Sequence, residues 1–203
     1  IYACEKAAAF GAKVVAMSDS GGYIYDKNGI DLPLIKQLKE VERKRISAYV
    51  ETHPEAEYHT GCAGIWTIPC GIALPCATQN ELDGQAAKTL IANGCFAVAE
   101  GANMPCTPEA VDALQAAGIL FAPAKAANAG GVATSALEMS QNSMRFYWSF
   151  EEVDDHLKRI MTDLYRNASD AAARFGMPGN LAAGANIAGF LKVADSMLAY
   201  GVV

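Results

Sequence analysis

The sequence contains few of the residues that build metal centres and no apolar stretch long enough to cross a membrane. It has three histidines among 203 residues, and its six cysteines form no CxxC pair, so no metal site is expected. No apolar run reaches the roughly 18 residues that a membrane-spanning helix needs. The N-terminal residues Ile1 to Lys6 lack a signal-peptide pattern. These absences predict a cytoplasmic protein.

Positive charge is also scarce. Sixteen Lys and Arg residues stand against 22 Asp and Glu residues, which gives a net charge of -6 and a pI near 5.1. Such a chain does not attract phosphate backbones or anionic membranes, so neither nucleic acid nor a membrane is expected as a partner. The hydrophobic content of 52% is enough for one sizeable core. A small molecule or another protein is the expected partner.

The cysteines are interpreted as reduced apolar residues, because free cysteine is usually buried. The alternative is a cysteine nucleophile, for which Cys76 is the candidate, although no arrangement of His, Asn or Asp accompanies it in the sequence. The chain starts without Met, and an alanine-rich helix over residues 2–10 follows at once. We therefore expect this sequence to be part of a longer protein.

Short apolar runs alternate with helical patterns along the first part of the chain. Strands are expected at residues 13–17, 23–25, 71–75, 96–99 and 119–122, and further helices at 31–52, 83–93 and 108–117. Gly94 closes one of these helices, and Thr107 with Pro108 begins another. This alternation predicts an α/β fold with a doubly wound parallel sheet. From residue 128 only helices are expected, at 130–147, 150–175 and 184–200.

Polar residues follow the expected strands in four loops, at residues 18–20, 75–80, 100–105 and 123–131. In doubly wound sheets, ligands bind beyond the carboxyl ends of the strands. Uncharged hydrogen-bonding side chains beside small residues suit a cofactor, because they orient it while allowing close approach. The alternative is that Asn and Gly only form turns and helix caps. Four such loops in succession favour a cofactor site.

Four motifs carry a resemblance to a known family: Pro-Cys-Ala-Thr-Gln-Asn-Glu-Leu at 75–82, Glu-Gly-Ala-Asn-Met-Pro at 100–105, residues 128–142, and Gly-Ala-Asn-Ile-Ala-Gly-Phe at 184–190. Together they resemble glutamate dehydrogenase of the hexameric bacterial and fungal kind, and the resemblance covers essentially the whole chain. It implies a Rossmann-like sheet that lacks its first strand and its glycine-rich turn. Residues 1–127 would form this truncated dinucleotide-binding domain. Residues 128–203 would form helices that pack on it and bridge to an absent N-terminal substrate domain.

The resemblance also implies an activity, the reversible oxidative deamination of L-glutamate to 2-oxoglutarate and ammonia with a nicotinamide cofactor. In the family, the catalytic lysines and aspartate lie in the N-terminal domain, so no catalytic residue is expected here. The isolated chain is predicted to be inactive, and the full-length protein is expected to be a homo-hexamer.

Residue roles follow from the same resemblance. Thr78 and Gln79 would lie against the adenosine side of the cofactor, Asn103 would hold the nicotinamide ribose, and Asn128 would contact the nicotinamide end. Ser135 would reach the side-chain carboxylate of glutamate from near a helix N-terminus, where an anion is favoured. The alternative for Ser135 is a helix serine bonded to its own backbone. Gly71 and Ala124 depart from the family pattern, which usually has Asp at the first position and Gly or Ser at the second.

The choice between NADP and NAD depends on the turn Ser18-Asp19-Ser20. An acidic residue after this strand generally binds the ribose 2'-hydroxyl of NAD. In the family, however, Ser-Asp-Ser resembles the NADP-preferring members, and a basic cluster could reach a 2'-phosphate: Lys39, Arg43, Lys44 and Arg45. NADP is therefore predicted, with NAD as the alternative. The basic cluster could instead be a solvated helix face with pairs such as Glu40 and Lys44.

Two rival functions remain open on the sequence. The first is another amino-acid dehydrogenase acting on leucine, phenylalanine or valine, in which an apolar residue would be expected in place of Ser135. The second is a non-catalytic binding module that kept the Rossmann-like fold.

Overall fold

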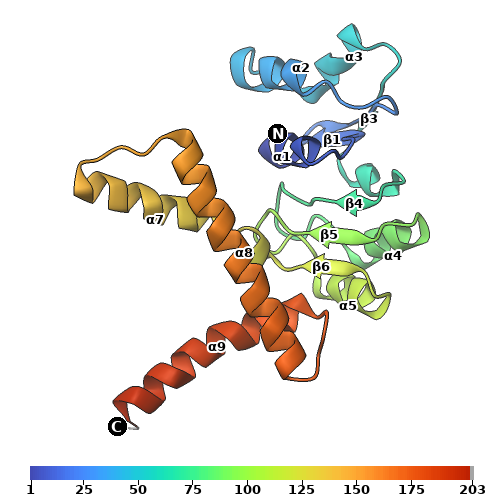
Figure 1. Ribbon diagram of the computed structural model, residues 1–203. Helices are drawn as coiled ribbons and strands as arrows, with labels where there is room; N and C mark the ends of the chain where they lie inside the picture. Colours follow the sequence, from blue (N-terminus) through green and yellow to red (C-terminus); the bar gives the residue numbers. More distant parts are fainter. Residues whose placement is uncertain (202–203) are drawn as a thin grey trace.

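The structure is a computed structural model that describes residues 1–201. It is a mixed α/β fold in which two small sheets lie one above the other beside a group of long helices (Figure 1). The alternation expected from the sequence is therefore confirmed, with one difference. The first two strands belong to an antiparallel sheet of their own.

The antiparallel sheet follows a short helix, α1 (Tyr2–Ala9). Its strands are β1 (Ala16–Asp19), β2 (Gly22–Tyr25) and β3 (Glu57–Thr60), in the order β1-β2-β3. The third strand was not expected, because its polar sequence Glu-Tyr-His-Thr has no apolar run. Backbone pairing with β2 makes it a strand.

The helix expected over residues 31–52 is wrong in its middle. The structure has α2 (Leu32–Lys36), a π-helical turn η1 (Gln37–Val41), a 3-10 turn η2 (Ile46–Ala48) and α3 (Tyr49–Thr52). Arg43 adopts a left-handed conformation with φ 56°, which ends the helix. The chain then returns to β1, where the Ile46 N–H donates to Asp19 at 2.9 Å. A tertiary contact thus overrides the helical periodicity.

The parallel sheet consists of β4 (Ile72–Ala73), β5 (Ala97–Ala99) and β6 (Leu120–Ala122), in the order β4-β5-β6. Helices α4 (Gly84–Ala92) and α5 (Pro108–Ala116) connect these strands. Asp83 caps α4 by accepting from the Gln85 and Ala86 N–H groups at 3.0 and 2.8 Å. Thr107 caps α5, as its position before Pro108 predicts.

The two sheets are joined by a 3-10 turn, η3 (Ala63–Thr67). Gly64 contacts the Tyr23 ring of β2 so closely that a Cβ there would lie 2.7 Å from it. Two residues later, the Trp66 ring is buried in the core of the parallel sheet. Its Nε1 donates to the Glu81 carbonyl oxygen at 3.0 Å. Within the described chain, β1 and β4 each have a hydrogen-bonded strand neighbour on one edge only.

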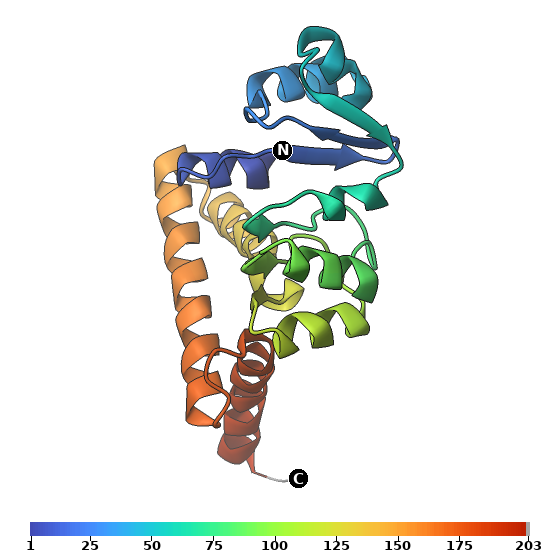
Figure 2. The ribbon, with the colours of Figure 1, turned by 90° about the vertical axis from the view of Figure 1, so that its right-hand side faces the viewer.

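The helices after residue 123 are α6 (Ala124–Ala127), α7 (Ala129–Met144), α8 (Phe150–Arg174) and α9 (Leu181–Tyr200). The last three lie close to the expected bounds, whereas α6 was expected to be part of a loop. Arg145 in a left-handed conformation ends α7, and a capping box of Ser149 and Glu152 begins α8. Helix α8 stands along one side of the molecule, with α1 near one end and α9 at the other (Figure 2). None of the helices in residues 1–201 is both long and apolar enough to span a bilayer.

Helices α8 and α9 cross at Gly184. A Cβ at this position would lie 2.0 Å from the Ala168 carbonyl oxygen of α8, so the crossing requires glycine. On the same helix, Gly189 has no atom within 4 Å of the position that a Cβ would take.

Gly184→Ala is expected to lower the free energy of unfolding by about 1–3 kcal/mol, because overpacking forces the two helices apart. Gly189→Ala is expected to be neutral or to stabilise by up to about 1 kcal/mol, since alanine favours a helix. Urea denaturation of both variants tests this. Equal effects of the two substitutions would contradict the close crossing.

Candidate functional site at the carboxyl ends of the parallel strands

The carboxyl ends of β4, β5 and β6 open on one edge of the sheet, because the three strands are parallel. The first part of α7 and the middle of α8 lie beside this edge (Figure 1). Three of the four loops predicted to hold a ligand therefore meet in one place. The fourth, residues 18–20, belongs to the antiparallel sheet.

Backbone hydrogen bonds fix the first two of these loops to each other. The Pro75 carbonyl oxygen accepts from the N–H groups of Gly101 and Ala102 at 3.0 and 3.1 Å. Further along, the Asn80 N–H donates to the Met104 carbonyl oxygen at 3.0 Å. A Cβ at Gly101 would lie 2.5 Å from Cys76 Sγ, so a larger residue here would require the Cys76 side chain to move. The predicted residues Thr78 and Gln79 lie exposed in the first of these loops, after β4.

Asn103 and Asn128 are brought together at the same edge. The Asn128 Nδ2 donates to Asn103 Oδ1 at 2.8 Å and to the Ala102 carbonyl oxygen at 3.3 Å. The two side chains come from the β5 loop and from the junction of α6 with α7. Exposed hydroxyl and amide groups therefore gather beyond the strand ends, and their donors and acceptors suit the ribose and amide groups of a dinucleotide.

Glu100 is a buried carboxylate to which the sequence analysis gave no role. It is 5% exposed. Its Oε1 accepts from the Cys106 N–H at 3.2 Å, and its Oε2 accepts from the Ala124 N–H at 2.6 Å. A buried carboxylate is stable only with such partners. Glu100 thereby holds the β5 loop to the start of α5 and to α6.

The turn after β1 forms a second polar group. Asp19 accepts from Lys39 Nζ at 2.7 Å, from Ile46 N–H at 2.9 Å and from Gly21 N–H at 2.9 Å. Partial burial acts to raise the pKa of Asp19, but these donors outweigh it and lower the pKa to about 2. The carboxylate thus remains charged and is held inward.

Only part of the basic cluster contacts this turn. Arg45 donates to the hydroxyl of Ser20, and Lys39 pairs with Asp19. Ser18 is half-buried in β1. The alternative pair of Glu40 with Lys44 is not the one formed, since Lys44 pairs with Glu42 at 2.8 Å. Lys39 and Arg45, rather than Lys44, are therefore placed at the Ser-Asp-Ser turn.

Ser135 lies exposed on α7. Its neighbour Thr134 bonds back to the Gly130 carbonyl oxygen at 2.9 Å, whereas the hydrogen bonds found within residues 1–201 include none to the Ser135 hydroxyl. The sequence analysis also missed a polar contact between two helices. Lys125 Nζ of α6 donates to Asn186 Oδ1 of α9 at 2.5 Å.

One group of side chains could approach a metal ion. Ligand atoms of Asp26, His53 and Glu55 lie within 4.8 Å of one another. Both Asp26 oxygens already accept hydrogen bonds, from Asn28 N–H at 2.8 Å and from Tyr49 OH at 3.2 Å. The hydrogen bond to Glu55 raises the pKa of His53. His53 pairs with Glu55 at 3.2 Å, and Asp26 is held by its own two hydrogen bonds, so the positions of the three side chains are explained without a metal ion.

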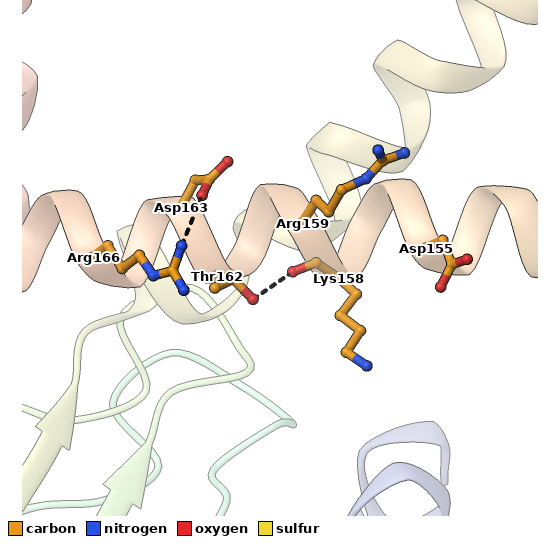
Figure 3. A pocket seen from close by; sticks show the side chains of 6 residues that line it. All are labelled: Asp155, Lys158, Arg159, Thr162, Asp163 and Arg166. Carbon is orange, nitrogen blue, oxygen red and sulfur yellow. Dashed lines mark hydrogen bonds and ion pairs between the residues drawn. The ribbon is translucent and has the colours of Figure 1, made fainter.

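A hollow of about 540 Å³ runs along α8 (Figure 3). All of its lining residues come from that one helix: Asp155, Lys158, Arg159, Thr162, Asp163 and Arg166. The Thr162 hydroxyl bonds to the Lys158 carbonyl oxygen at 2.7 Å within the helix. This open helix face does not assemble side chains from different elements, whereas the strand-end loops do.

Comparison with known proteins decides the family. The sequence pattern of the Glutamate/Leucine/Phenylalanine/Valine dehydrogenase family matches residues 1–201. The chain belongs to this family. The resemblance drawn from the four motifs is therefore confirmed.

Individual relatives agree. An NADP-specific glutamate dehydrogenase of Helicobacter pylori is 51% identical in an alignment of 208 positions, which covers 100% of this chain and 46% of the relative. A glutamate dehydrogenase of Bacteroides thetaiotaomicron is 53% identical in an alignment of 209 positions, again with 46% of the relative covered. The crystal structure of Plasmodium falciparum glutamate dehydrogenase superposes with a TM-score of 0.93 at 43% identity, over 100% of this chain and 44% of that one. The chain thus spans about half the length of its relatives.

The two departures from the dehydrogenase pattern affect packing. A Cβ at Gly71 would lie 2.7 Å from the Phe96 ring, so a larger residue would require Phe96 to move. Ala124 is buried and binds Glu100 through its backbone N–H, a bond that any residue except proline can make. Cys76 is an exposed residue, but partial desolvation of its sulfur raises the pKa of its thiol, which disfavours the nucleophile alternative.

Glu100→Gln is expected to lower the free energy of unfolding by about 2 kcal/mol, because the amide NH₂ cannot accept from a backbone N–H and leaves a buried donor unpaired. Glu138→Gln, at an exposed position of α7, is the matched control and is expected to change stability by less than about 0.5 kcal/mol. Denaturant titrations measure both. A neutral Glu100→Gln variant would show that this carboxylate does not hold the loops.

Proposed function

We propose that this chain is the nucleotide-binding half of a glutamate dehydrogenase. The whole protein would interconvert L-glutamate with 2-oxoglutarate and ammonia by hydride transfer to or from a nicotinamide cofactor. The proposal is carried by the joined strand-end loops with their exposed amide and hydroxyl side chains, in a chain that is 51–53% identical to proteins named glutamate dehydrogenase. The runner-up, a non-catalytic Rossmann-like module, has no support from those relatives.

Within this proposal each site residue has a role. Thr78 and Gln79 bind the adenosine side of the cofactor, Asn103 the nicotinamide ribose and Asn128 the nicotinamide end. The Asn103–Asn128 hydrogen bond orients both amides before the cofactor binds. The bound nicotinamide carries the hydride, while these residues fix its position.

Catalysis is assigned to a part of the protein outside this chain. The relatives are about twice as long as the matched region, and the lysines and aspartate expected from the resemblance lie outside it. Residues 1–127 form the dinucleotide-binding part in this proposal, and residues 128–203 the helices that bridge to the substrate domain. The proposal includes a homo-hexameric, cytoplasmic enzyme, and the chain alone is expected to be inactive.

We assign NADP as the preferred cofactor. Asp19 is occupied by Lys39 and by two backbone N–H groups, so it is poorly placed to accept from a ribose 2'-hydroxyl. Arg45 reaches the hydroxyl of Ser20, and a guanidinium beside a hydroxyl suits a 2'-phosphate. The name of the Helicobacter relative, NADP-specific glutamate dehydrogenase, supports this assignment. NAD remains the alternative, since a Xylanibacter ruminicola relative is named NAD(P)-specific.

Arg45→Ala in the whole protein is expected to weaken NADP binding by about tenfold, the loss of roughly one charge-assisted contact, and to leave NAD binding unchanged. Lys44→Ala is the matched control, because Lys44 is paired with Glu42. Fluorescence titration of the reduced cofactors gives both dissociation constants. Equal losses for NADP and NAD would remove Arg45 from the 2'-phosphate site.

Ser135 is proposed to bind the side-chain carboxylate of glutamate, and this separates the enzyme from dehydrogenases of leucine, phenylalanine or valine. The hydroxyl is exposed on α7, and no hydrogen bond among the described residues 1–201 occupies it, so it can bind a ligand. A site that hydrogen-bonds its substrate discriminates strongly against substrates that lack the group.

Ser135→Val in the whole protein is expected to reduce kcat/KM for glutamate by tenfold or more, on the order of one lost hydrogen bond to a charged group. The value for leucine should change far less. Ser140→Val, further along the same exposed helix, is the control for helix stability. Equal losses on the two amino acids would place Ser135 outside the substrate pocket.

A further inference from the structure

Two cysteines, Cys70 and Cys95, lie at matching positions just before β4 and β5. Cys70 precedes Ile72 by two residues, and Cys95 precedes Ala97 by two residues, while Ile72 and Ala97 are register partners in the parallel sheet. Residues at matching positions of parallel strands point to the same face. Neighbouring strands lie about 4.8 Å apart, within the range of about 4.4–6.8 Å between Cα atoms that a disulfide spans.

Backbone bonds extend this pairing to the cysteines themselves. The Gly71 carbonyl oxygen accepts from Phe96 N–H at 2.9 Å and from Ala97 N–H at 3.2 Å. The residues that follow the two cysteines are therefore held together. Cys95 is 3% exposed in the core of the parallel sheet, and the half-buried Cys70 packs against the same core.

The two thiols also contact each other. The interaction between them raises the pKa of Cys70 and lowers the pKa of Cys95. The Cys95 sulfur additionally lies 3.3 Å from the Ala97 carbonyl oxygen. Cys95 thus loses its proton first, and its thiolate can accept the proton of the neighbouring Cys70 thiol, whose sulfur is the accessible one.

No role in the proposed function uses these cysteines. They differ from Cys106, whose pKa is raised by burial, and from Cys62, which is exposed. Cys70 combines partial exposure with a partner thiol in reach. A small oxidant can therefore reach the Cys70 sulfur, and the buried Cys95 sulfur is close enough to react in a second step.

We propose that Cys70 and Cys95 are a redox-active dithiol that a small disulfide, such as glutathione disulfide, oxidises to an intramolecular disulfide between β4 and β5. The accessible Cys70 thiol passes its proton to the Cys95 thiolate as its sulfur attacks one sulfur of glutathione disulfide, the S–S bond breaks and one glutathione thiolate leaves. The second cysteine then attacks the mixed disulfide and displaces the other glutathione. Two protein thiols are oxidised, one glutathione disulfide is reduced to two glutathione thiols, and the protons pass to them.

The disulfide would tie together the amino ends of the two strands whose carboxyl ends lead into the loops at 75–80 and 100–105. It would close a loop through α4 and so restrict the unfolded chain, which raises the melting temperature. The inference rests on the strand register and does not depend on the proposed function.

The test oxidises the folded protein in glutathione buffers of rising disulfide content, followed by acid quenching, maleimide labelling of the remaining thiols and peptide mass mapping. Cys70 and Cys95 are expected to lose their label together in one transition, with the two peptides joined and about 2 Da lighter for the two hydrogens removed. The Tm of the oxidised protein should rise by several degrees, and the near-ultraviolet circular dichroism should show that it remains folded.

Cys62→Ser is expected to leave this transition unchanged, whereas Cys70→Ser should abolish it and leave Cys95 reduced. The measurement on the unmodified sequence stands even where a variant folds poorly. Retention of both labels in glutathione disulfide alone would overturn the proposal. So would mixed disulfides that never resolve, or a disulfide that joins Cys70 to a different cysteine.

Discussion

One buried carboxylate, Glu100, determines how the strand-end loops are arranged. It follows β5 directly and accepts backbone hydrogen bonds from Cys106 and Ala124, so the ends of three segments meet on one side chain. Burial of a carboxylate costs several kcal/mol without such partners, and the loops are therefore held where these bonds are satisfied. The pairing of Asn103 with Asn128, on which the proposed cofactor site depends, follows from this arrangement.

Features set by neighbours in sequence were predictable. The cap at Thr107, the left-handed Gly94 and the three C-terminal helices are all found near their expected places, because each depends on residues within one or two turns. The break after Val41 was not predictable, since Asp19 draws the Ile46 N–H back to β1 across the fold. Strand β3 was missed for a similar reason, as its polar residues become a strand only through pairing with β2.

Some features of the candidate site were likewise predictable from the sequence and others were not. The placement of Asn103 and Asn128 beyond the strand ends follows from the alternation of strands and helices, because parallel strands end on one edge. The hydrogen bonds to Glu100 and the contact of Arg45 with Ser20 could not be predicted, since each joins segments that are far apart in the sequence. The comparisons establish the dehydrogenase family, while the roles of individual residues rest on the geometry and on the motifs.

Hydrogen–deuterium exchange of the whole protein, with and without NADP, tests the central claim most directly. The account predicts that the cofactor slows exchange in the loops at 75–80, 100–105 and 123–131 and at the turn 18–21, because these segments surround the proposed site. It predicts no slowing in residues 190–200 of α9, which lie at the far end of the molecule from α1 (Figure 2). Protection confined to α8, or loops whose exchange is unchanged at saturating NADP, would contradict a cofactor site at the strand ends.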